Sequence, residues 1–299
     1  MRDHLERTVA AMADADVDVL VLGREANARF VSGANRLWLA GTRPFAPGCA
    51  VVRRTRAVHL LGITDDGVPS TVPPEHLYPI SWNPMNLVGA VAAIPGVRDA
   101  RRVGVDGMTP LFEQLFHAVL PGAELVDGES LMRDARRVKT ADDVAGIRAA
   151  AEVARDALVA TLAASTATKT PNELKGVFAE RMCSHGVTTP AFEPQFTIRG
   201  AVVAARAGVI RDGWEASLAR TRPADERVTT AKCRPGTSVG TLRALGTTVE
   251  GVGMGHEVLA DDDVLEPGMV VYVEATHDGS VHGDTVLVTD DDPDVLTAP

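Results

Sequence analysis

The segment 250–289 places the tightest limits on how this chain can fold. Residues 270–275 and 281–289 carry apolar side chains at strand spacing on either side of Asp278-Gly279, a dipeptide typical of tight turns. This pattern predicts a β-hairpin with Glu274 in the middle of its first strand. A carboxylate buried there must pair with a cation, bind a metal or take up a proton, because desolvating a lone charge is too costly.

Charge and composition exclude several classes of protein. The net charge of −10 argues against a nucleic-acid or anionic-membrane partner, since both require a basic surface. No apolar run approaches the roughly 20 residues of a membrane span, and the charged N-terminus lacks the apolar core of a secretion signal. The three cysteines are widely spaced and odd in number. We therefore expect a cytoplasmic protein with reduced thiols.

The first half of the chain alternates between strand and helix patterns. Segment 69–84 is interpreted as a loop, and the polar segment 132–139 is interpreted as a connector that contains a domain boundary. Alternation of helices and strands predicts an α/β domain over residues 1–135, with a mostly parallel sheet covered by helices. The expected strands are 17–23, 49–52, 57–61 and 102–105, and the expected helices are 3–14, 87–94 and 110–119.

The second half, 136–299, opens with two helices. Thr140 is a good N-cap for an alanine-rich helix that extends to about residue 163. The segment Thr170-Pro171-Asn172-Glu173 is a capping box that starts a second helix, which Gly186 ends. Antiparallel strands follow. This half is expected to be an α+β domain.

The motifs of the second half resemble those of a known family. The runs GVGMGHE, LEPGMVVYVEA and DTVLVT, in this order, are similar to the signature of the pita-bread family that includes aminopeptidase P, prolidase and creatinase. The resemblance covers almost the whole chain. It implies a creatinase-like N-terminal domain, with a loop at 27–33 between its first two strands, followed by a shortened pita-bread domain. It also implies a homodimer and a small-molecule or short-peptide ligand.

The resemblance also implies where metal ligands would lie. Metallopeptidases of this family hold two metal ions with two aspartates, a histidine and two glutamates. In this chain the matching positions are Arg206, Ser217, Glu250, Glu274 and Gly283. Four of the five ligands are therefore replaced, so no metal ion and no other cofactor is expected.

Arg206 is predicted to take the place of the metal. A guanidinium can bind Glu274 or Glu250 through two parallel hydrogen bonds, and its fixed charge would repel a metal ion. The alternative is that Arg206 points into solvent at the end of a strand. A buried pair is favoured because a glutamate in the middle of a strand needs a partner.

Four further residues are candidates for the site. His256 lies among acidic residues and is the best general acid or base in the chain, although it could instead be a loop histidine bonded to the backbone. Its neighbour Glu257 and the strand residue Glu215 could add to an acidic substrate-binding cluster. Trp38 matches a segment that in family dimers reaches toward the partner's active site, although a core tryptophan is the commoner role.

The pattern GxSxG at 236–240 would make Ser238 a nucleophile. A nucleophile elbow needs a strand before it and a helix after it. Residues 232–235 are a poor strand, so a nucleophile elbow is not expected. The resemblance implies that this stretch opens a helix instead.

Three functions remain open at this stage. The first is a metal-independent, creatinase-like hydrolase of a small C–N compound, in which Glu274 and Glu250 hold the substrate and His256 transfers a proton. The second is a non-catalytic relative that binds a ligand or a partner. The third is an Xaa-Pro peptidase with rearranged metal ligands. We favour the first.

Overall fold

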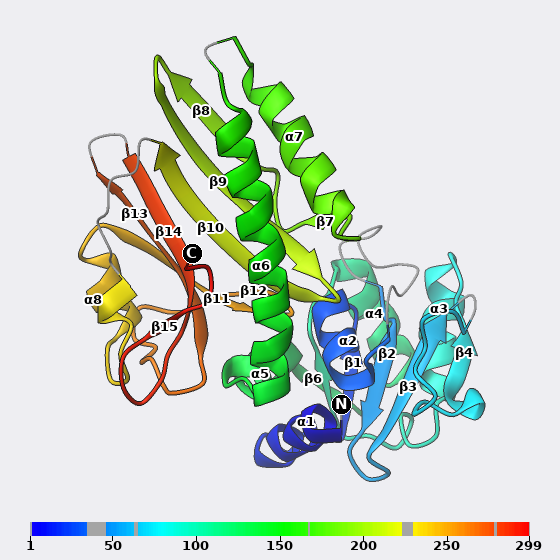
Figure 1. The fold of residues 1–299 in the computed structure, drawn as a ribbon. Helices are drawn as coiled ribbons and strands as arrows, with labels where there is room; N and C mark the ends of the chain where they lie inside the picture. Colours follow the sequence, from blue (N-terminus) through cyan, green and yellow to red (C-terminus); the bar gives the residue numbers. More distant parts are fainter. Residues whose placement is uncertain are drawn as a thin grey trace. The chain divides into compact units, whose positions relative to one another are not determined.

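A computed structural model of the chain describes residues 2–34, 46–62, 65–166, 168–222, 230–277 and 280–298, except for the side chains of Arg2 and His256. The chain divides into two compact units, Met1–Arg136 and Arg137–Pro299, and both are drawn in Figure 1. Within the described ranges, no helix combines the length and the apolar character needed to cross a membrane.

The first unit is built on a six-stranded mixed sheet in the order β4-β3-β2-β1-β5-β6. Its strands are β1 (Val19–Leu22), β2 (Cys49–Val52), β3 (Ala57–Gly62), β4 (Leu77–Pro79), β5 (Arg102–Val105) and β6 (Glu124–Asp127). Its helices are α1 (Arg2–Asp14), α2 (Glu25–Ser32), α3 (Pro84–Ala93), α4 (Pro110–Val119) and α5 (Gly128–Arg137), with the 3-10 helix η1 (Pro74–His76). The expected strands and helices of this half are confirmed within a few residues at their ends.

The sheet is less parallel than predicted. β1 pairs in parallel with β5, β5 with β6 and β3 with β4, but β2 is antiparallel to both β1 and β3. The turn at 53–56 is too short for the crossover that parallel strands require, so β2 and β3 form a hairpin. Leu87 and Val91 of α3 and Phe116 of α4 are fully buried in the core that includes Val19 and Val21 of β1.

The prediction of a loop at 27–33 is wrong, because residues 27–32 belong to α2 and Gly33 is its C-cap. The carboxylate of Asp106 accepts hydrogen bonds from the backbone N–H of Gly23 (2.8 Å) and of Arg24 (3.0 Å), at the start of the helix. It also accepts from Nδ2 of Asn27 at 2.9 Å. A residue about eighty positions away therefore stabilises the N-terminus of α2, which local sequence patterns cannot reveal.

Two further expectations for the first half need correction. The segment 132–139 is not a simple connector, because most of it belongs to α5. Asp127 starts this helix by accepting from the backbone N–H of Glu129 (2.9 Å) and Ser130 (3.2 Å), and Met132 is fully buried. The segment 69–84 is not only a loop, because it contains η1 and the edge strand β4.

The second unit contains a larger sheet in the order β12-β11-β13-β14-β10-β9-β7, with β8 paired to β9 and β15 paired to β14. Its strands are β7 (Thr189–Pro190), β8 (Gln195–Arg199), β9 (Val202–Arg211), β10 (Trp214–Arg222), β11 (Thr247–Gly253), β12 (Gly255–Glu257), β13 (Val270–His277), β14 (Ser280–Leu287) and β15 (Asp294–Val295). Its helices are α6 (Ala141–Ala164), α7 (Pro171–Ser184) and α8 (Val239–Arg243), with the 3-10 helix η2 (Thr230–Lys232). The predicted hairpin of β13 and β14 is confirmed, although Asp278 and Gly279 lie outside the described residues.

Helices α6 and α7 lie along β8, β9 and β10 (Figure 1). Thr140 and Thr170 begin these helices with the capping boxes of their sequences, which confirms both predictions. Ile147 of α6 and Phe178 of α7 are fully buried against the sheet. At Gly146, an added Cβ would lie 2.2 Å from Cδ1 of Trp214 on β10, so glycine permits close approach of α6.

Candidate active site

One row of residues crosses five strands of the larger sheet. Arg206 on β9 pairs with Ala219 on β10, which pairs with Gly283 on β14. Gly283 in turn pairs with Glu274 on β13, and Glu274 pairs with Thr248 on β11. Directly paired residues of antiparallel strands present their side chains on the same face. The two charged residues of this row are therefore separated only by the methyl side chain of Ala219 and by Gly283, which has no side chain.

Arg206 and Glu274 form a close ion pair across this gap. Nε of Arg206 lies 2.7 and 2.8 Å from the two carboxylate oxygens of Glu274, and Nη2 lies 2.7 Å from Oε1. The side chain of Glu274 is 9% exposed and that of Arg206 is 36% exposed. Hydrogen bonds to the carboxylate are the main cause that raises the pKa of Arg206. The guanidinium thus supplies the counter-charge that a carboxylate in the middle of a strand requires.

Tyr272 completes the environment of Glu274. Its hydroxyl donates to Oε2 of Glu274 at 2.6 Å, and burial is the main cause that raises its pKa. The same hydroxyl would lie 2.5 Å from a Cβ added at Gly283. A side chain at position 283 would therefore collide with Tyr272, which occupies the space next to Glu274. Tyr272 lies in the strand predicted over residues 270–275, and the sequence predicts no role for it.

Glu215 lies two residues before Ser217 on β10, on the same face of the sheet as Arg206 and Glu274. Burial is the largest cause that raises its pKa to about 7, and the charges of Glu250 and Glu257 add to the rise. The hydrogen bond that Oγ of Ser217 donates to Oε1 of Glu215, 3.3 Å long, lowers this pKa. The carboxyl group therefore exchanges its proton near neutral pH, which suits it to general acid–base chemistry.

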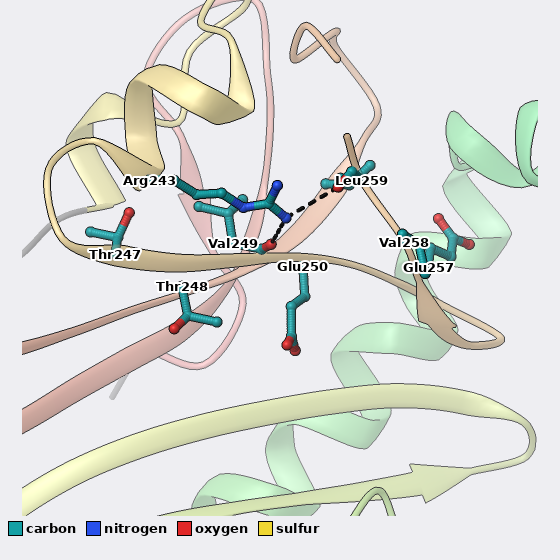
Figure 2. A pocket seen from close by; sticks show the side chains of 8 residues that line it. All are labelled: Arg243, Thr247, Thr248, Val249, Glu250, Glu257, Val258 and Leu259. Carbon is teal, nitrogen blue, oxygen red and sulfur yellow. Dashed lines mark hydrogen bonds between the residues drawn. The ribbon is translucent and has the colours of Figure 1, made fainter. Parts of the chain in front are cut away.

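A pocket of about 400 Å³ opens beside Glu250. Figure 2 shows Glu250 and Thr248 on one side of β11 and Arg243 on the other. Nη2 of Arg243 donates to the backbone oxygens of Val249 on β11 (3.0 Å) and of Leu259 after β12 (3.1 Å), and so links two segments that line the pocket. The lining residues are Arg243, Thr247, Thr248, Val249, Glu250, Glu257, Val258 and Leu259.

Glu257, the second acid of this pocket, is held by a lysine that sequence analysis missed. Nζ of Lys139 lies 2.7 Å from Oε2 of Glu257, and both side chains are almost fully buried. Nζ also donates to the backbone oxygen of Arg137 at 3.1 Å. Lys139 stands in a segment that looked like a polar connector, and nothing nearby in the sequence indicated a buried partner.

Of the remaining candidates His256, Trp38 and Ser238, the structure describes Ser238 and the backbone of His256. The backbone of His256 pairs with Val252 in the β11–β12 hairpin, but its side chain lies outside the described residues, as does the whole of Trp38. Ser238 is the N-cap of α8 and accepts from the backbone N–H of Thr241 at 3.1 Å. A helix therefore opens in this stretch, as the resemblance implies.

The described residues that the resemblance matches to metal ligands do not fit a pair of metal ions. Divalent metals of this kind need several oxygen or nitrogen donors directed at one point. Glu274 is bound by a guanidinium, Ser217 donates to Glu215, and position 283 has no side chain. Among the described residues, no group of three or more histidine, cysteine, aspartate or glutamate side chains could hold a metal ion.

Comparisons with known proteins agree with this architecture. Residues 4–138 match the family model "Creatinase/Prolidase N-terminal domain". No curated protein matches the chain by sequence. The fold is similar to that of a prolidase from Pyrococcus horikoshii, with a TM-score of 0.78, 16% identity, and 99% of this chain and 98% of that chain covered.

Two further solved structures have similar folds. An Xaa-Pro dipeptidase from Bacillus anthracis matches with a TM-score of 0.79 and 17% identity, covering 100% of this chain and 98% of that chain. A proline aminopeptidase P II from Yersinia pestis matches with a TM-score of 0.73 and 15% identity, covering 99% and 96%. The predicted architecture, a creatinase-like domain followed by a pita-bread domain, is confirmed.

Replacing Arg206 tests the ion pair. Arg206→Met should lower the free energy of unfolding by about 1–3 kcal/mol at pH 8, because a buried carboxylate loses its charged donor. The loss should be smaller at pH 5, where a proton can replace the guanidinium. Urea unfolding at both pH values measures this. Arg234→Met, which removes an exposed pair with Asp292, should change stability by less than about 0.5 kcal/mol.

The double variant Arg206→Met/Glu274→Gln should be more stable at pH 8 than Arg206→Met alone, because the uncompensated charge is gone. Strictly additive losses in the two single variants would contradict a direct pair.

The raised pKa of Glu215 predicts a pH-dependent stability. The native state holds the Glu215 proton up to about pH 7, whereas the unfolded chain releases it near the ordinary glutamate pKa of 4.5. The native state therefore loses relative stability as pH rises from 4.5 to 7. Glu215→Gln, which keeps a neutral side chain, should match the wild type at pH 4.5 and exceed it by about 3 kcal/mol at pH 8.

Denaturant unfolding of both proteins across this range gives the difference directly. Glu152→Gln on the exposed face of α6 is the matched control. A difference between Glu215→Gln and wild type that stays constant with pH would contradict the assignment.

Proposed function

Because the chain carries a creatinase/prolidase N-terminal domain and has the pita-bread fold of prolidases, we propose that it is a metal-independent hydrolase of a C–N bond in a small peptide or amide. The single observation that carries this proposal is the Arg206–Glu274 pair at the family's ligand positions. A fixed cation there offers the positive charge that a metal ion would otherwise bring to a reacting carbonyl group.

Arg206 is proposed to stabilise the oxyanion. Its bonds to Glu274 and Thr276 use Nε and Nη2, and the side chain is one-third exposed. Nη1 can then donate to the carbonyl oxygen of a substrate as negative charge develops there. Glu274 and Tyr272 keep the guanidinium in place, so Glu274 acts by orienting Arg206 rather than by taking up a proton.

Two carboxyl groups are proposed to transfer the protons. Glu250, in the pocket, takes a proton from the attacking water as its oxygen bonds to the carbonyl carbon. Glu215, protonated below about pH 7, gives its proton to the nitrogen as the C–N bond breaks. The products are a carboxylic acid and an amine. Carboxyl groups whose environments differ can divide the roles of acid and base in this way.

His256 remains a predicted proton carrier, on the strength of its position in β12 beside Glu257. Glu257 is paired with Lys139 and is proposed to shape the pocket rather than to react. The names of the similar solved structures, a prolidase and an Xaa-Pro dipeptidase, make Xaa-Pro dipeptides the first substrates to test, followed by other small amides and guanidino compounds.

Hydrolysis after chelation tests the proposal. The purified protein should cleave a member of this panel at the same rate with and without EDTA, and added Mn²⁺ or Co²⁺ should not raise the rate. Glu250→Gln and Glu215→Gln should each lower kcat by about 10²–10⁴-fold, a typical contribution of general acid–base catalysis. In the wild type, kcat should fall as pH rises through about 7, because Glu215 loses its proton. Glu152→Gln should retain full activity.

Activity that appears only with added metal would identify an Xaa-Pro peptidase with rearranged ligands instead. Binding of a panel compound without turnover would identify a non-catalytic relative. Either result contradicts the proposal.

A further inference from the structure

The junction between β10 and β14 is bonded differently from the junctions on either side of it. Every residue of β10 has a registered partner on β9, and every residue of β13 has one on β14. In the described part of the chain, β10 and β14 share one registered pair, Ala219 with Gly283. The segments 217–221 and 281–285 that meet at this junction are called the seam.

Two threonine hydroxyls replace the missing backbone pairs of the seam. Oγ1 of Thr285 accepts from the N–H of Ser217 at 3.0 Å and donates to its C=O at 2.8 Å. Oγ1 of Thr221 accepts from the N–H of Val281 at 2.7 Å and donates to its C=O at 3.2 Å. These bonds lie two residues to either side of the paired alanine and glycine, where a regular antiparallel ladder would place its next bonded pairs.

Both threonines are buried: Thr285 has no exposed surface, and Thr221 is 7% exposed. Each hydroxyl satisfies one backbone donor and one backbone acceptor that a widened junction would otherwise leave buried without partners. The seam therefore has a fixed spacing that depends on two side chains rather than on a continuous backbone ladder.

Arg220 and Asp284 also link β10 to β14. They are the strand neighbours of Ala219 and Gly283, so their side chains point to the opposite face of the sheet from Arg206 and Glu274. Nη1 of Arg220 donates to the backbone oxygens of Gly283 (2.6 Å) and Ala219 (2.9 Å). Nη2 bonds the buried carboxylate of Asp284 at 2.5 Å. Burial alone would raise the pKa of Asp284, but bonds from His282, Arg220 and Thr297 outweigh burial and keep it low.

The Arg206–Glu274 pair crosses this seam, because Arg206 lies on β9, on the β10 side, and Glu274 lies on β13, on the β14 side. We infer that Thr221 and Thr285 are positioning residues whose hydroxyls hold β10 and β14 at the spacing that lets Arg206 reach Glu274. The inference rests on the proposed function for its effect on catalysis, whereas its effect on the ion pair is independent of any activity.

A larger distance between β10 and β14 would weaken the Arg206–Glu274 pair. The bonds from Arg206 to Glu274 are 2.7–2.8 Å long, and such bonds weaken steeply beyond about 3.2 Å. Valine has the shape of threonine but can neither accept nor donate. A valine at either position would leave a buried N–H and C=O unpaired, and the strands would separate to admit water.

Nuclear magnetic resonance of valine and serine variants tests the inference. In Thr285→Val the amide of Ser217 should exchange with solvent about tenfold faster or more, the equivalent of one lost hydrogen bond, and in Thr221→Val the amide of Val281 should do the same. In both variants the Nε–H signal of Arg206, assigned by its absence in Arg206→Lys, should shift and exchange faster. Thr285→Ser and Thr221→Ser should restore the wild-type values.

Thr161→Val is the matched control, because Thr161 is fully buried and its hydroxyl donates to the backbone oxygen of Ala157 within its own helix. It should leave all three signals unchanged. The inference is overturned if the two amides stay protected in the valine variants. It is also overturned if they lose protection while the Arg206 signal does not move.

Catalysis provides a separate readout. If the protein hydrolyses a panel compound, Thr285→Val and Thr221→Val should lower kcat by about 10- to 100-fold, the scale of a small misplacement of reacting groups, with recovery in the serine variants. An inactive wild type with the expected resonance changes would refute the proposed function and leave the positioning role of the two threonines in place.

Discussion

The carboxylate of Glu274 needs a counter-charge, and the architecture of the candidate site follows from that need. It lies in the middle of a strand with 9% of its side chain exposed, where an unpaired charge would be very costly. Arg206 meets the need from three strands away. The small residues Ala219 and Gly283 between them, the hydroxyl of Tyr272 and the threonines of the seam all permit or support that one contact.

Electrostatics then divides the acids of the site into different roles. Glu274 is neutralised by Arg206, and Glu257 is neutralised by Lys139. The pKa of Glu215 is instead raised to about 7, chiefly by burial and also by the charges of Glu250 and Glu257. The site therefore combines a fixed cation, Arg206, with a carboxyl group, Glu215, that keeps its proton near neutral pH. This combination is the physical basis for the proposed acid–base hydrolysis.

The fold and the central ion pair could be predicted from the sequence, but several features of the site could not. Glu274 stood at a strand position that demands a partner, and Arg206 was the cation that the family resemblance placed nearby. Capping residues such as Thr140 and Thr170 act within four positions, so their helices were also predictable. In contrast, Asp106 stabilises the start of α2 from about eighty positions away, and Lys139 binds Glu257 across more than a hundred positions. Local patterns contain no record of such contacts. The role of Thr221 and Thr285 depends on one junction that is not continuously paired, which only the register reveals.

The most direct measurement of the central claim is anomalous diffraction from crystals grown with Mn²⁺. The guanidinium of Arg206 should lie within hydrogen-bonding distance of both oxygens of Glu274, with no anomalous peak beside them. Two strong peaks next to Glu274, with Arg206 displaced toward solvent, would contradict the account.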